Sequence, residues 1–265
     1  MVMMCDAAVS PTLFQKQRHP AWAHERIQVI HDGIDTDRFR PDPSAAVRLS
    51  AAGLTLSARD EVVTFACRNL EPYRGYHIFM RALPLLQRLR PDARVVIVGG
   101  DDTSYGAKAP AGSTWRNLFL QEVKRDLDLS RVHFVGQLPH AVLTQLMQVS
   151  RVHVYLTYPF VLSWSLLEAM SIGCLVVGSD TAPLREVIEH GRNGMLTDLF
   201  DVQKLAETTA AALNEGQALQ PLRVRARQTI LERFDLRRLC LPAQLAMFGV
   251  RRPLQLSGSG AARPA

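Results

Sequence analysis

Short apolar runs recur along the middle of the chain, and longer amphipathic segments separate them. The runs are rich in valine, leucine and isoleucine. Continuous apolar runs of this length are typical of strands that are buried on both faces of a sheet. We therefore predict six strands, at Val62–Cys67, Arg94–Val98, Val132–Val135, Val152–Leu156, Leu175–Gly178 and Met195–Thr197.

The segments between these strands have apolar residues at helical spacing. The clearest one begins after Ser163, a good N-cap residue, and ends at Gly173, which suits a C-terminal cap. Strands that alternate with helices form a parallel sheet covered on both faces, with right-handed crossovers. We therefore predict an α/β fold, a doubly wound Rossmann-like sheet with strand order 3-2-1-4-5-6. The other predicted helices are Tyr76–Arg90, Trp115–Leu127, His140–Val149, Pro183–His190 and Val202–Leu213.

The two ends of the chain do not follow this alternation. Before the first strand we predict a short helix from Ser10 to Arg18, a strand at Ile27–His31 and a helix at Ala45–Leu56. After the last strand, the helices Pro221–Phe234 and Leu236–Phe248 have no strand partner. The final helix has an apolar stripe, and the Ser- and Gly-rich segment beyond it has the composition of a disordered tail.

Composition and charge narrow the classes of function. The chain has 265 residues, 47% of them hydrophobic, and a net charge of +6 that is spread along its length. No dense basic run is interleaved with aromatic residues, which argues against nucleic acid as a partner. A phosphorylated ligand or peripheral contact with an anionic membrane surface explains the charge equally well. The four cysteines lack metal-ligand spacing, and neither a signal peptide nor a membrane-spanning run is present, so we expect a cytoplasmic protein with reduced thiols and no bound metal.

The predicted topology places a ligand site at the carboxyl ends of the first and fourth strands. The loop after the first strand holds Arg68 and Arg74, and Gly75 follows them. Guanidinium groups bind phosphate oxygens in bidentate fashion, so two arginines in this loop suit a diphosphate. Glu168 is a carboxylate in the apolar helix that follows the fourth strand, and we expect it to contact the same ligand.

Other motifs carry less information. The Gly-x-Gly-x-x-Gly fingerprint is absent after the first strand, which argues against a nicotinamide enzyme, and there is no P-loop. Backbone groups at Gly136, after the third strand, fit a nucleobase pocket or a plain turn equally well. His31 is the histidine most worth testing, although packing explains it as well as function does. We interpret the face formed by Trp164 and Leu166 as core.

Together these residues resemble the C-terminal half of retaining glycosyltransferases of family 4, which have the two-domain GT-B fold. The similarity extends from about Cys5 to Phe248. Residues 27–39 resemble the segment that joins the two domains of that family. Arg68 and the Arg74-Gly75 pair match the positions that hold the donor diphosphate, with Arg in place of the family's Lys at position 74. Glu168 matches the second Glu of the Glu-x7-Glu motif, which binds the ribose hydroxyls of the nucleotide.

The chain departs from the family pattern in two ways. Phe160 stands where the family has the first Glu of the motif, which contacts the donor sugar. The loop of Phe160, Val161 and Leu162 is therefore expected to contact the donor in another way, for instance through backbone amides. The resemblance also implies that an N-terminal Rossmann domain with the acceptor site is missing. On this basis we divide the chain into an N-terminal remnant with the interdomain connection (1–43), a nucleotide-sugar-binding domain (44–234), a crossover helix (235–252) and a disordered tail (253–265).

The resemblance implies a glycosyltransferase of glycan biosynthesis that transfers a sugar, with retained configuration, from a nucleoside diphosphate donor to a glycan, lipid or small-molecule acceptor. Arg68 and Arg74 would be the catalytic residues, stabilising the leaving diphosphate without a metal or a cofactor. Two alternatives remain, a nucleotide-sugar epimerase and a non-catalytic nucleotide-sugar-binding module. We also expect the chain to self-associate or to bind a separate N-terminal domain, because its last helix would otherwise expose an apolar stripe.

Overall fold

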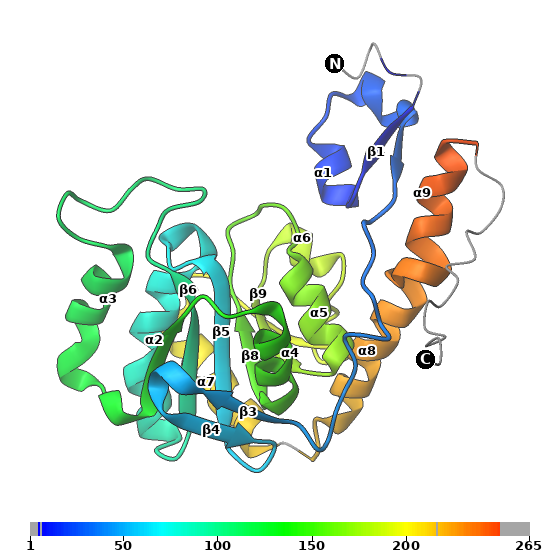
Figure 1. Cartoon of the computed structure of the whole chain (residues 1–265). Coiled ribbons are helices and arrows are strands. Elements are labelled where there is room, and N and C mark those ends of the chain that lie inside the picture. The colour runs from blue at the N-terminus through cyan, green and yellow to red at the C-terminus, as the bar shows by residue number, and fades with distance from the viewer. Residues whose placement is uncertain (1–4, 6, 216, 250–265) are drawn as a thin grey trace, which may run out of the picture.

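Six parallel strands form the central sheet of the computed structural model, which describes residues 5, 7–215 and 217–249 (Figure 1). The strand order is β10-β9-β8-β5-β6-β7, which is 3-2-1-4-5-6 when these six strands are numbered along the chain. Each strand runs parallel to its neighbours. The predicted doubly wound α/β sheet is therefore confirmed. Its strands are β5 (Val62–Asn69), β6 (Arg94–Gly100), β7 (Val132–Gly136), β8 (Val152–Tyr155), β9 (Leu175–Ser179) and β10 (Met195–Thr197).

Helices cover both faces of the sheet, and alternate residues of each strand pack against opposite layers. In β5, Val63 and Phe65 belong to the core on the side of α2 and α7, whereas Val62 and Ala66 belong to the core on the side of α4, α5 and α8. All four side chains are buried, as expected for a parallel sheet with two covered faces. The helices of this domain are α2 (Tyr76–Leu89), α3 (Trp115–Val123), α4 (His140–Val149), α5 (Trp164–Ile172), α6 (Ala182–Arg185), α7 (Val202–Asn214) and α8 (Gln220–Arg233).

The predicted helix at Ala45–Leu56 is wrong. This segment is an antiparallel hairpin of β3 (Ala46–Leu49) and β4 (Leu54–Ser57), joined by one turn of 3-10 helix at Ser50–Ala52. Its apolar side chains are buried at every second position, which is the period of a strand and not of a helix. Gly53, with φ of 58°, makes the turn that a side chain would strain.

The predicted helix at Pro183–His190 is too long, because α6 ends at Arg185. The Asn193 side chain forms hydrogen bonds with backbone groups that would pair with other backbone groups in a longer helix. Its Oδ1 accepts a hydrogen bond from Glu189 N at 2.7 Å, and its Nδ2 donates to Val187 O at 2.9 Å. A buried side chain that bonds the backbone in this way competes with helix formation.

A small N-terminal unit precedes the hairpin (Figure 1). Two short strands pair in parallel. The sequence predicted the second of these strands, at Ile27–His31, but neither the first strand nor the pairing. Thr12 caps the helix between them by accepting a hydrogen bond from Gln15 N. The backbone N–H groups of Leu13 and Phe14 donate to the Glu186 carboxylate, so the unit contacts the segment after α6. Its elements are β1 (Ala8–Ser10), α1 (Leu13–Gln17), a 3-10 helix (Ala21–Arg26) and β2 (Ile27–Val29).

The segment that leaves β2 lies side by side with the start of the C-terminal helical segment. Ile34 N donates to Phe234 O at 2.7 Å, and Leu236 N donates to Ile34 O at 2.9 Å. Gly33 has φ of 93°, and a Cβ atom there would lie 2.7 Å from Leu236 Cα, so glycine is needed for this close approach. The C-terminal segment consists of a π-helical turn (Leu236–Cys240) followed by α9 (Leu241–Met247).

The division of the chain into four parts stays a prediction, and its tail at 253–265 lies outside the described residues.

Burial of His153 in β8 is expected to make the fold sensitive to acid. The imidazole is fully buried, and its Nδ1 lies 3.0 Å from the hydroxyl of Thr64. Desolvation lowers the pKa of His153 to about 4, from 6.5 in the unfolded chain. The unfolded state therefore binds more protons than the folded state between these values. The stabilisation from the neutral buried imidazole is present above about pH 6.5 and is lost as the pH falls toward 4.

We expect the free energy of unfolding to fall by roughly 3 kcal/mol from His153 alone as the pH falls from about 6.5 to 4, since one pKa unit corresponds to about 1.4 kcal/mol. Urea unfolding at a series of pH values measures this loss. His153→Leu should flatten the profile in this window, whereas replacing the exposed His19 by leucine should not change it. A His153→Leu profile as steep as that of the wild type would show that other groups cause the acid sensitivity.

Candidate functional site

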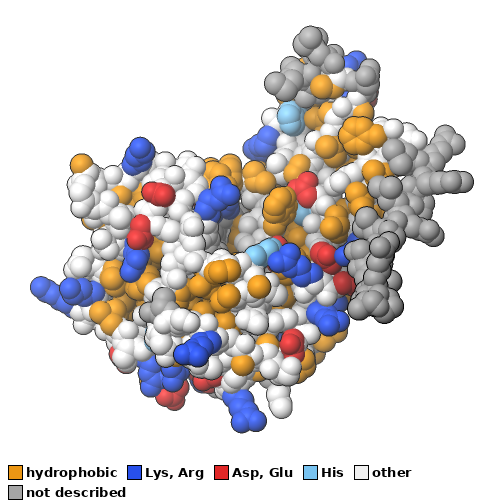
Figure 2. All heavy atoms as spheres, viewed as in Figure 1, with side chains coloured by type: hydrophobic (Ala, Val, Ile, Leu, Met, Phe, Trp, Pro, Cys, Tyr) orange, Lys and Arg blue, Asp and Glu red, His pale blue; other side chains and the backbone are white. Residues whose placement is uncertain are grey.

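A cavity of about 740 Å³ opens at the carboxyl ends of β5 and β8. These strands are neighbours at the switch point of the sheet, where loops leave in opposite directions. The volume is within the range of sites for small molecules. Figure 2 shows the surface hollowed between the sheet domain and the N-terminal unit. The predicted site residues that line the cavity are Arg68, Arg74, Phe160, Val161, Leu162 and Glu168.

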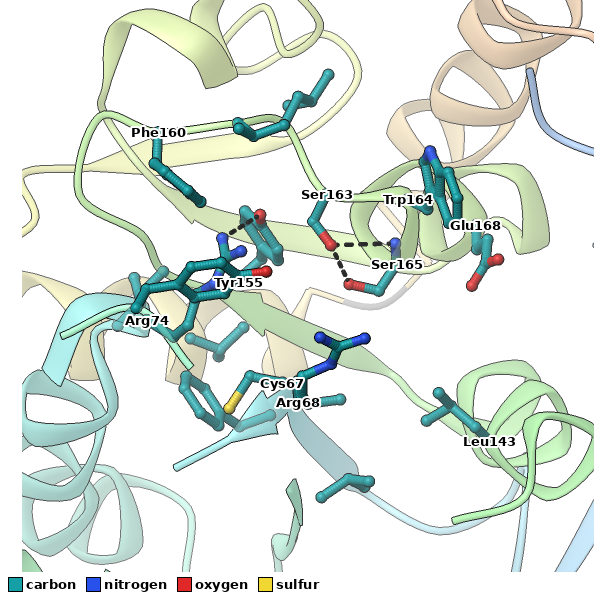
Figure 3. A pocket seen from close by; sticks show the side chains of 18 of the residues that line it. Cys67, Arg68, Arg74, Leu143, Tyr155, Phe160, Ser163, Trp164, Ser165 and Glu168 are labelled. Carbon is teal, nitrogen blue, oxygen red and sulfur yellow. Dashed lines mark hydrogen bonds between the residues drawn. The ribbon is translucent and has the colours of Figure 1, made fainter. Parts of the chain in front are cut away.

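Arg68 lies near the end of β5, and its guanidinium projects into the cavity (Figure 3). Its backbone carbonyl accepts a hydrogen bond from Gln137 Nε2 at 3.3 Å, which joins the end of β5 to the loop after β7. The side chain is exposed. Within the described part of the chain, no carboxylate forms an ion pair with it. Its positive charge is therefore available to an anionic ligand.

Arg74 ends the turn of 3-10 helix at Pro72–Arg74 and is half-buried. Its Nη1 donates to Thr157 Oγ1 at 3.3 Å and to Tyr155 Oη at 3.5 Å, both at the end of β8. Burial raises the pKa of the Tyr155 phenol, which therefore stays neutral at physiological pH. None of the described carboxylates is paired with Arg74. The cavity thus contains two guanidinium groups that form no ion pair with a described carboxylate.

Glu168 reaches the cavity from helix α5, on the side opposite Arg74 (Figure 3). Ser163 caps this helix, since its hydroxyl accepts a hydrogen bond from Ser165 N at 3.2 Å. The side chain of Glu168 is 16% exposed. The structure therefore brings Arg68, Arg74 and Glu168 together at one cavity, as the topology argument predicted.

His140, the first residue of α4, orients the Glu168 carboxylate. Its Nε2 lies 3.3 Å from Glu168, and its Nδ1 accepts a hydrogen bond from Arg38 Nη2 at 3.2 Å. A guanidinium can only donate, so Nδ1 is the acceptor and Nε2 carries the proton in the neutral ring. The resulting chain of Arg38, His140 and Glu168 fixes the carboxylate from the segment that follows β2.

The loop after β8 forms one wall of the cavity. Leu162 is buried, Val161 is exposed, and the Phe160 ring lies near Arg74, with 5.4 Å between the ring centroid and Cζ. Among the described residues, no protein acceptor hydrogen-bonds the backbone N–H groups of Phe160, Val161 and Leu162. These amides can therefore donate to a ligand, and contact of this loop with a donor stays a prediction.

Gly75 and Gly136 are not among the described residues that line the cavity. Gly75 is the N-cap residue of α2, with φ of 69°, and a Cβ atom there would lie 2.3 Å from Leu156 Cβ. Gly136 ends β7 with φ of 67°, and the adjacent Gln137 reaches the cavity in its place. Both glycines have a positive φ that residues with side chains rarely adopt. Their contact with a donor stays a prediction.

Trp164 is not part of the core, in contrast to the prediction. It is 58% exposed at the mouth of the cavity, and its Nε1 donates to Asp32 Oδ2 at 3.0 Å. Leu166 is fully buried, as predicted. His31 lines the cavity with its ring against Phe234, and burial lowers its pKa. The segment after β2 thus contributes to the mouth of the cavity.

Tyr105 and His140 also line the cavity and were not predicted. Both belong to connections that leave the carboxyl ends of strands, Tyr105 after β6 and His140 after β7. That position was the available signal in the sequence, since loops at this edge of a doubly wound sheet surround the ligand. Within the described residues, no cluster of three or more histidine, cysteine or acidic side chains could hold a metal ion. No helix in the same part of the chain has the length and apolar character needed to cross a membrane.

The sheet topology and the cavity at its switch point define a class of protein, a doubly wound Rossmann-like domain with a candidate ligand site at its switch point. The family model described as glycosyl transferases group 1 matches residues 60–215, and the model described as glycosyl transferase family 4 group matches residues 1–39. The chain belongs to the glycosyl transferases group 1 family. The resemblance to family 4 glycosyltransferases is confirmed.

Relatives of the chain include D-inositol 3-phosphate glycosyltransferases. The protein of Mycobacterium sp. (strain JLS) is 31% identical over 194 residues, which cover 73% of this chain and 40% of the relative. The protein of Nocardia farcinica (strain IFM 10152) is 28% identical over 205 residues, which cover 76% of this chain and 43% of the relative. The chain thus spans less than half the length of these curated relatives.

Solved structures confirm the fold. Anabaena Alr3699/HepE in complex with UDP superposes with a TM-score of 0.74 at 23% identity, over 92% of this chain and 64% of that chain. The C-terminal domain of the glycosyl transferase group 1 family protein LpcC from Francisella tularensis gives a TM-score of 0.62 at 16% identity, over 77% of this chain and 100% of that chain.

Proposed function

We propose that the cavity binds the nucleoside diphosphate of a sugar donor, and that the chain is the donor-binding part of a retaining glycosyltransferase. The observation that carries this proposal is the pair of guanidinium groups, Arg68 and Arg74, that face one cavity without a carboxylate partner among the described residues. Unpaired arginines at the switch point suit a diphosphate, because each guanidinium can bind two phosphate oxygens. Alr3699/HepE, which shares the fold, was crystallised with UDP and with UDP-glucose.

The two arginines would also act in the chemical step. When the bond between the sugar and the diphosphate breaks, negative charge accumulates on the leaving diphosphate. Arg68 and Arg74 would stabilise this charge from positions that are fixed before the reaction, and fixed charges of this kind commonly contribute several kcal/mol. In this proposal the nucleotide sugar is a substrate, and no cofactor takes part.

Glu168 would bind the ribose hydroxyls, and His140 would hold its carboxylate in position for them. Carboxylate oxygens accept charge-assisted hydrogen bonds from hydroxyl groups. The backbone N–H groups of Phe160, Val161 and Leu162 would donate to the sugar or to its phosphate. The acceptor would be a glycan, a lipid or a small molecule, as for the family.

We extend the proposal to location and partners. Cys67, Cys174 and Cys240 are free thiols, which favours a cytoplasmic protein.

The N-terminal unit exposes a group of large apolar side chains, which favours association with a further domain or a second copy. Sedimentation velocity of the purified chain measures self-association, and a monomer at all concentrations would contradict association with a second copy. The exposed residues are Val9, Leu13, Trp22 and Val29.

The proposed function is tested by calorimetric titration of the chain with UDP, GDP and ADP and with inorganic pyrophosphate. We expect at least one nucleoside diphosphate to bind, and Glu168→Gln to weaken that nucleotide about tenfold while leaving pyrophosphate affinity unchanged. The physical reason is that Glu168 faces the ribose, and hydrogen bonds to charged groups contribute about 1.5–3 kcal/mol.

Glu207→Gln, an exposed residue on α7 outside the cavity, is the matched control and should leave both affinities unchanged. Failure of all nucleotides to bind, or equal losses for nucleotide and pyrophosphate in Glu168→Gln, would contradict the proposal. Product analysis with a nucleotide sugar and no acceptor separates an epimerase, which would interconvert sugars, from a transferase.

A further inference from the structure

The loop between β6 and α3 carries Tyr105 to the cavity. Tyr105 is 45% exposed and lines the cavity beside Arg74 and Phe160. Its ring centroid lies 4.9 Å from the Cζ atom of Arg74 and 5.0 Å from the centroid of the Phe160 ring. Arg74 therefore packs into a corner formed by two aromatic rings, one from each side of the switch point. Guanidinium groups stack favourably on aromatic faces at these distances.

Glu71, in the connection between β5 and α2, fixes the position of this loop through hydrogen bonds. Its side chain is fully buried, and its Oε2 accepts hydrogen bonds from three consecutive backbone N–H groups, those of Ser104 at 3.1 Å, Tyr105 at 3.2 Å and Gly106 at 3.3 Å. A buried carboxylate is costly unless it is hydrogen-bonded, so these contacts are needed to keep Glu71 inside. Asn69 adds a second attachment, because its Nδ2 donates to Ser104 Oγ at 2.7 Å.

The attachment links the loop directly to the segment that carries Arg74. Glu71 and Arg74 are three residues apart, in the same connection between β5 and α2. The Tyr105 ring is thereby fixed relative to the guanidinium and not merely near it. Nη1 of Arg74 is used by Tyr155 and Thr157, whereas no described protein group accepts a hydrogen bond from its Nε or Nη2. The rings and the Nη1 contacts together orient the free edge of the guanidinium.

We infer that Tyr105 is a positioning residue of the donor site, and that Glu71 acts through it. Tyr105 holds the guanidinium of Arg74 in the plane that presents Nε and Nη2 to the diphosphate, which spares the ligand the entropic cost of ordering a long side chain. The inference rests on the proposed function, and it adds the β6–α3 loop to the part of the site that recognises the diphosphate.

The test compares Tyr105→Ala with Tyr105→Phe, using two probes. Inorganic pyrophosphate reports on the diphosphate contacts, and the nucleoside of the preferred nucleotide, without phosphates, reports on the remainder of the site. We expect Tyr105→Ala to weaken pyrophosphate and nucleoside diphosphate about tenfold, which corresponds to about 1.4 kcal/mol, and to leave nucleoside affinity unchanged. Tyr105→Phe keeps the ring and should bind as the wild type does.

Glu71→Gln should produce part of the same loss, and adding it to Tyr105→Ala should produce no further loss, because Glu71 acts through the ring. Trp22→Ala, which removes an exposed aromatic side chain from the N-terminal unit, is the control and should change none of the affinities. If Glu71→Gln does not fold, the two Tyr105 variants still decide the question.

The possible results are distinct. Wild-type affinity for pyrophosphate in Tyr105→Ala overturns the inference and leaves the proposed function intact. A loss in Tyr105→Phe equal to that in Tyr105→Ala assigns the effect to the hydroxyl group, which overturns positioning by the ring. A parallel loss of nucleoside affinity shows a general distortion and overturns the inference as well. No binding of any nucleoside diphosphate or of pyrophosphate by the wild-type chain overturns the proposed function, and the inference with it.

Discussion

Reversal of the charge at position 74 is expected to weaken nucleoside diphosphate binding by about a hundredfold or more. Arg74→Glu removes a guanidinium whose Nη1 is already fixed by Tyr155 and Thr157, and places a carboxylate where the diphosphate is expected. Loss of a charge-assisted hydrogen bond costs about 1.5–3 kcal/mol, and the repulsion between two anions adds to this cost. Calorimetric titration of both proteins with the preferred nucleotide measures the change.

Arg88→Glu is the matched control for this experiment. Arg88 is exposed at the far end of α2, the helix that begins two residues after Arg74, and it does not line the cavity. Both variants change the net charge by the same amount, so a loss of affinity caused by the overall charge would appear in both. Equal affinity in wild type and Arg74→Glu would show that Arg74 does not bind the phosphates.

The binding measurements should also depend on salt in a predictable way. Affinity for pyrophosphate comes from charge, so it should fall as the ionic strength rises, and it should fall less in Arg74→Glu than in the wild type. This dependence separates an electrostatic contact from a change in packing, which salt would affect little.

The architecture of the sheet could be predicted because each strand has a local pattern of apolar residues in the sequence. A run such as Leu175–Val177 is apolar at consecutive positions, and a strand covered on both faces requires this pattern. The order of the strands then follows from right-handed crossovers, which need no knowledge of individual side chains. The segment Ala45–Leu56 failed because its alanines and leucines are good helix formers, and the alternation of buried positions became clear only once the hairpin was packed on the core.

Only part of the candidate site could be read from the sequence. Arg68 and Arg74 were found because they follow a predicted strand at the edge where ligands bind. Tyr105 was missed because its place over Arg74 depends on a buried carboxylate, Glu71, that captures backbone groups more than thirty residues away. His140 was missed for a similar reason, since its contact with Glu168 joins two helices. Such tertiary contacts leave no periodic signal in a single sequence.

The structure gives Gly75 a role that its sequence position did not reveal. We expect Gly75→Ala to lower the free energy of unfolding by about 3 kcal/mol or more. Its φ of 69° is strained for any residue with a side chain, which costs about 1–2 kcal/mol. A Cβ atom would also lie 2.3 Å from Leu156 Cβ, and relieving such a clash in a packed interior costs about 1–3 kcal/mol more. Urea unfolding measures the change.

Gly112→Ala separates the two contributions. Gly112 has φ of 79°, and nothing lies within 4 Å of the position that its Cβ atom would take, so this variant carries the backbone strain without the clash. We expect it to lose about 1–2 kcal/mol, and the difference between the two variants is then the cost of displacing α2 from the end of β8. Because Arg74 directly precedes Gly75, that displacement should also weaken pyrophosphate binding. If Gly75→Ala is no less stable than Gly112→Ala yet loses pyrophosphate affinity, the glycine is needed for close approach of the ligand to the backbone, and packing against Leu156 is not its main role.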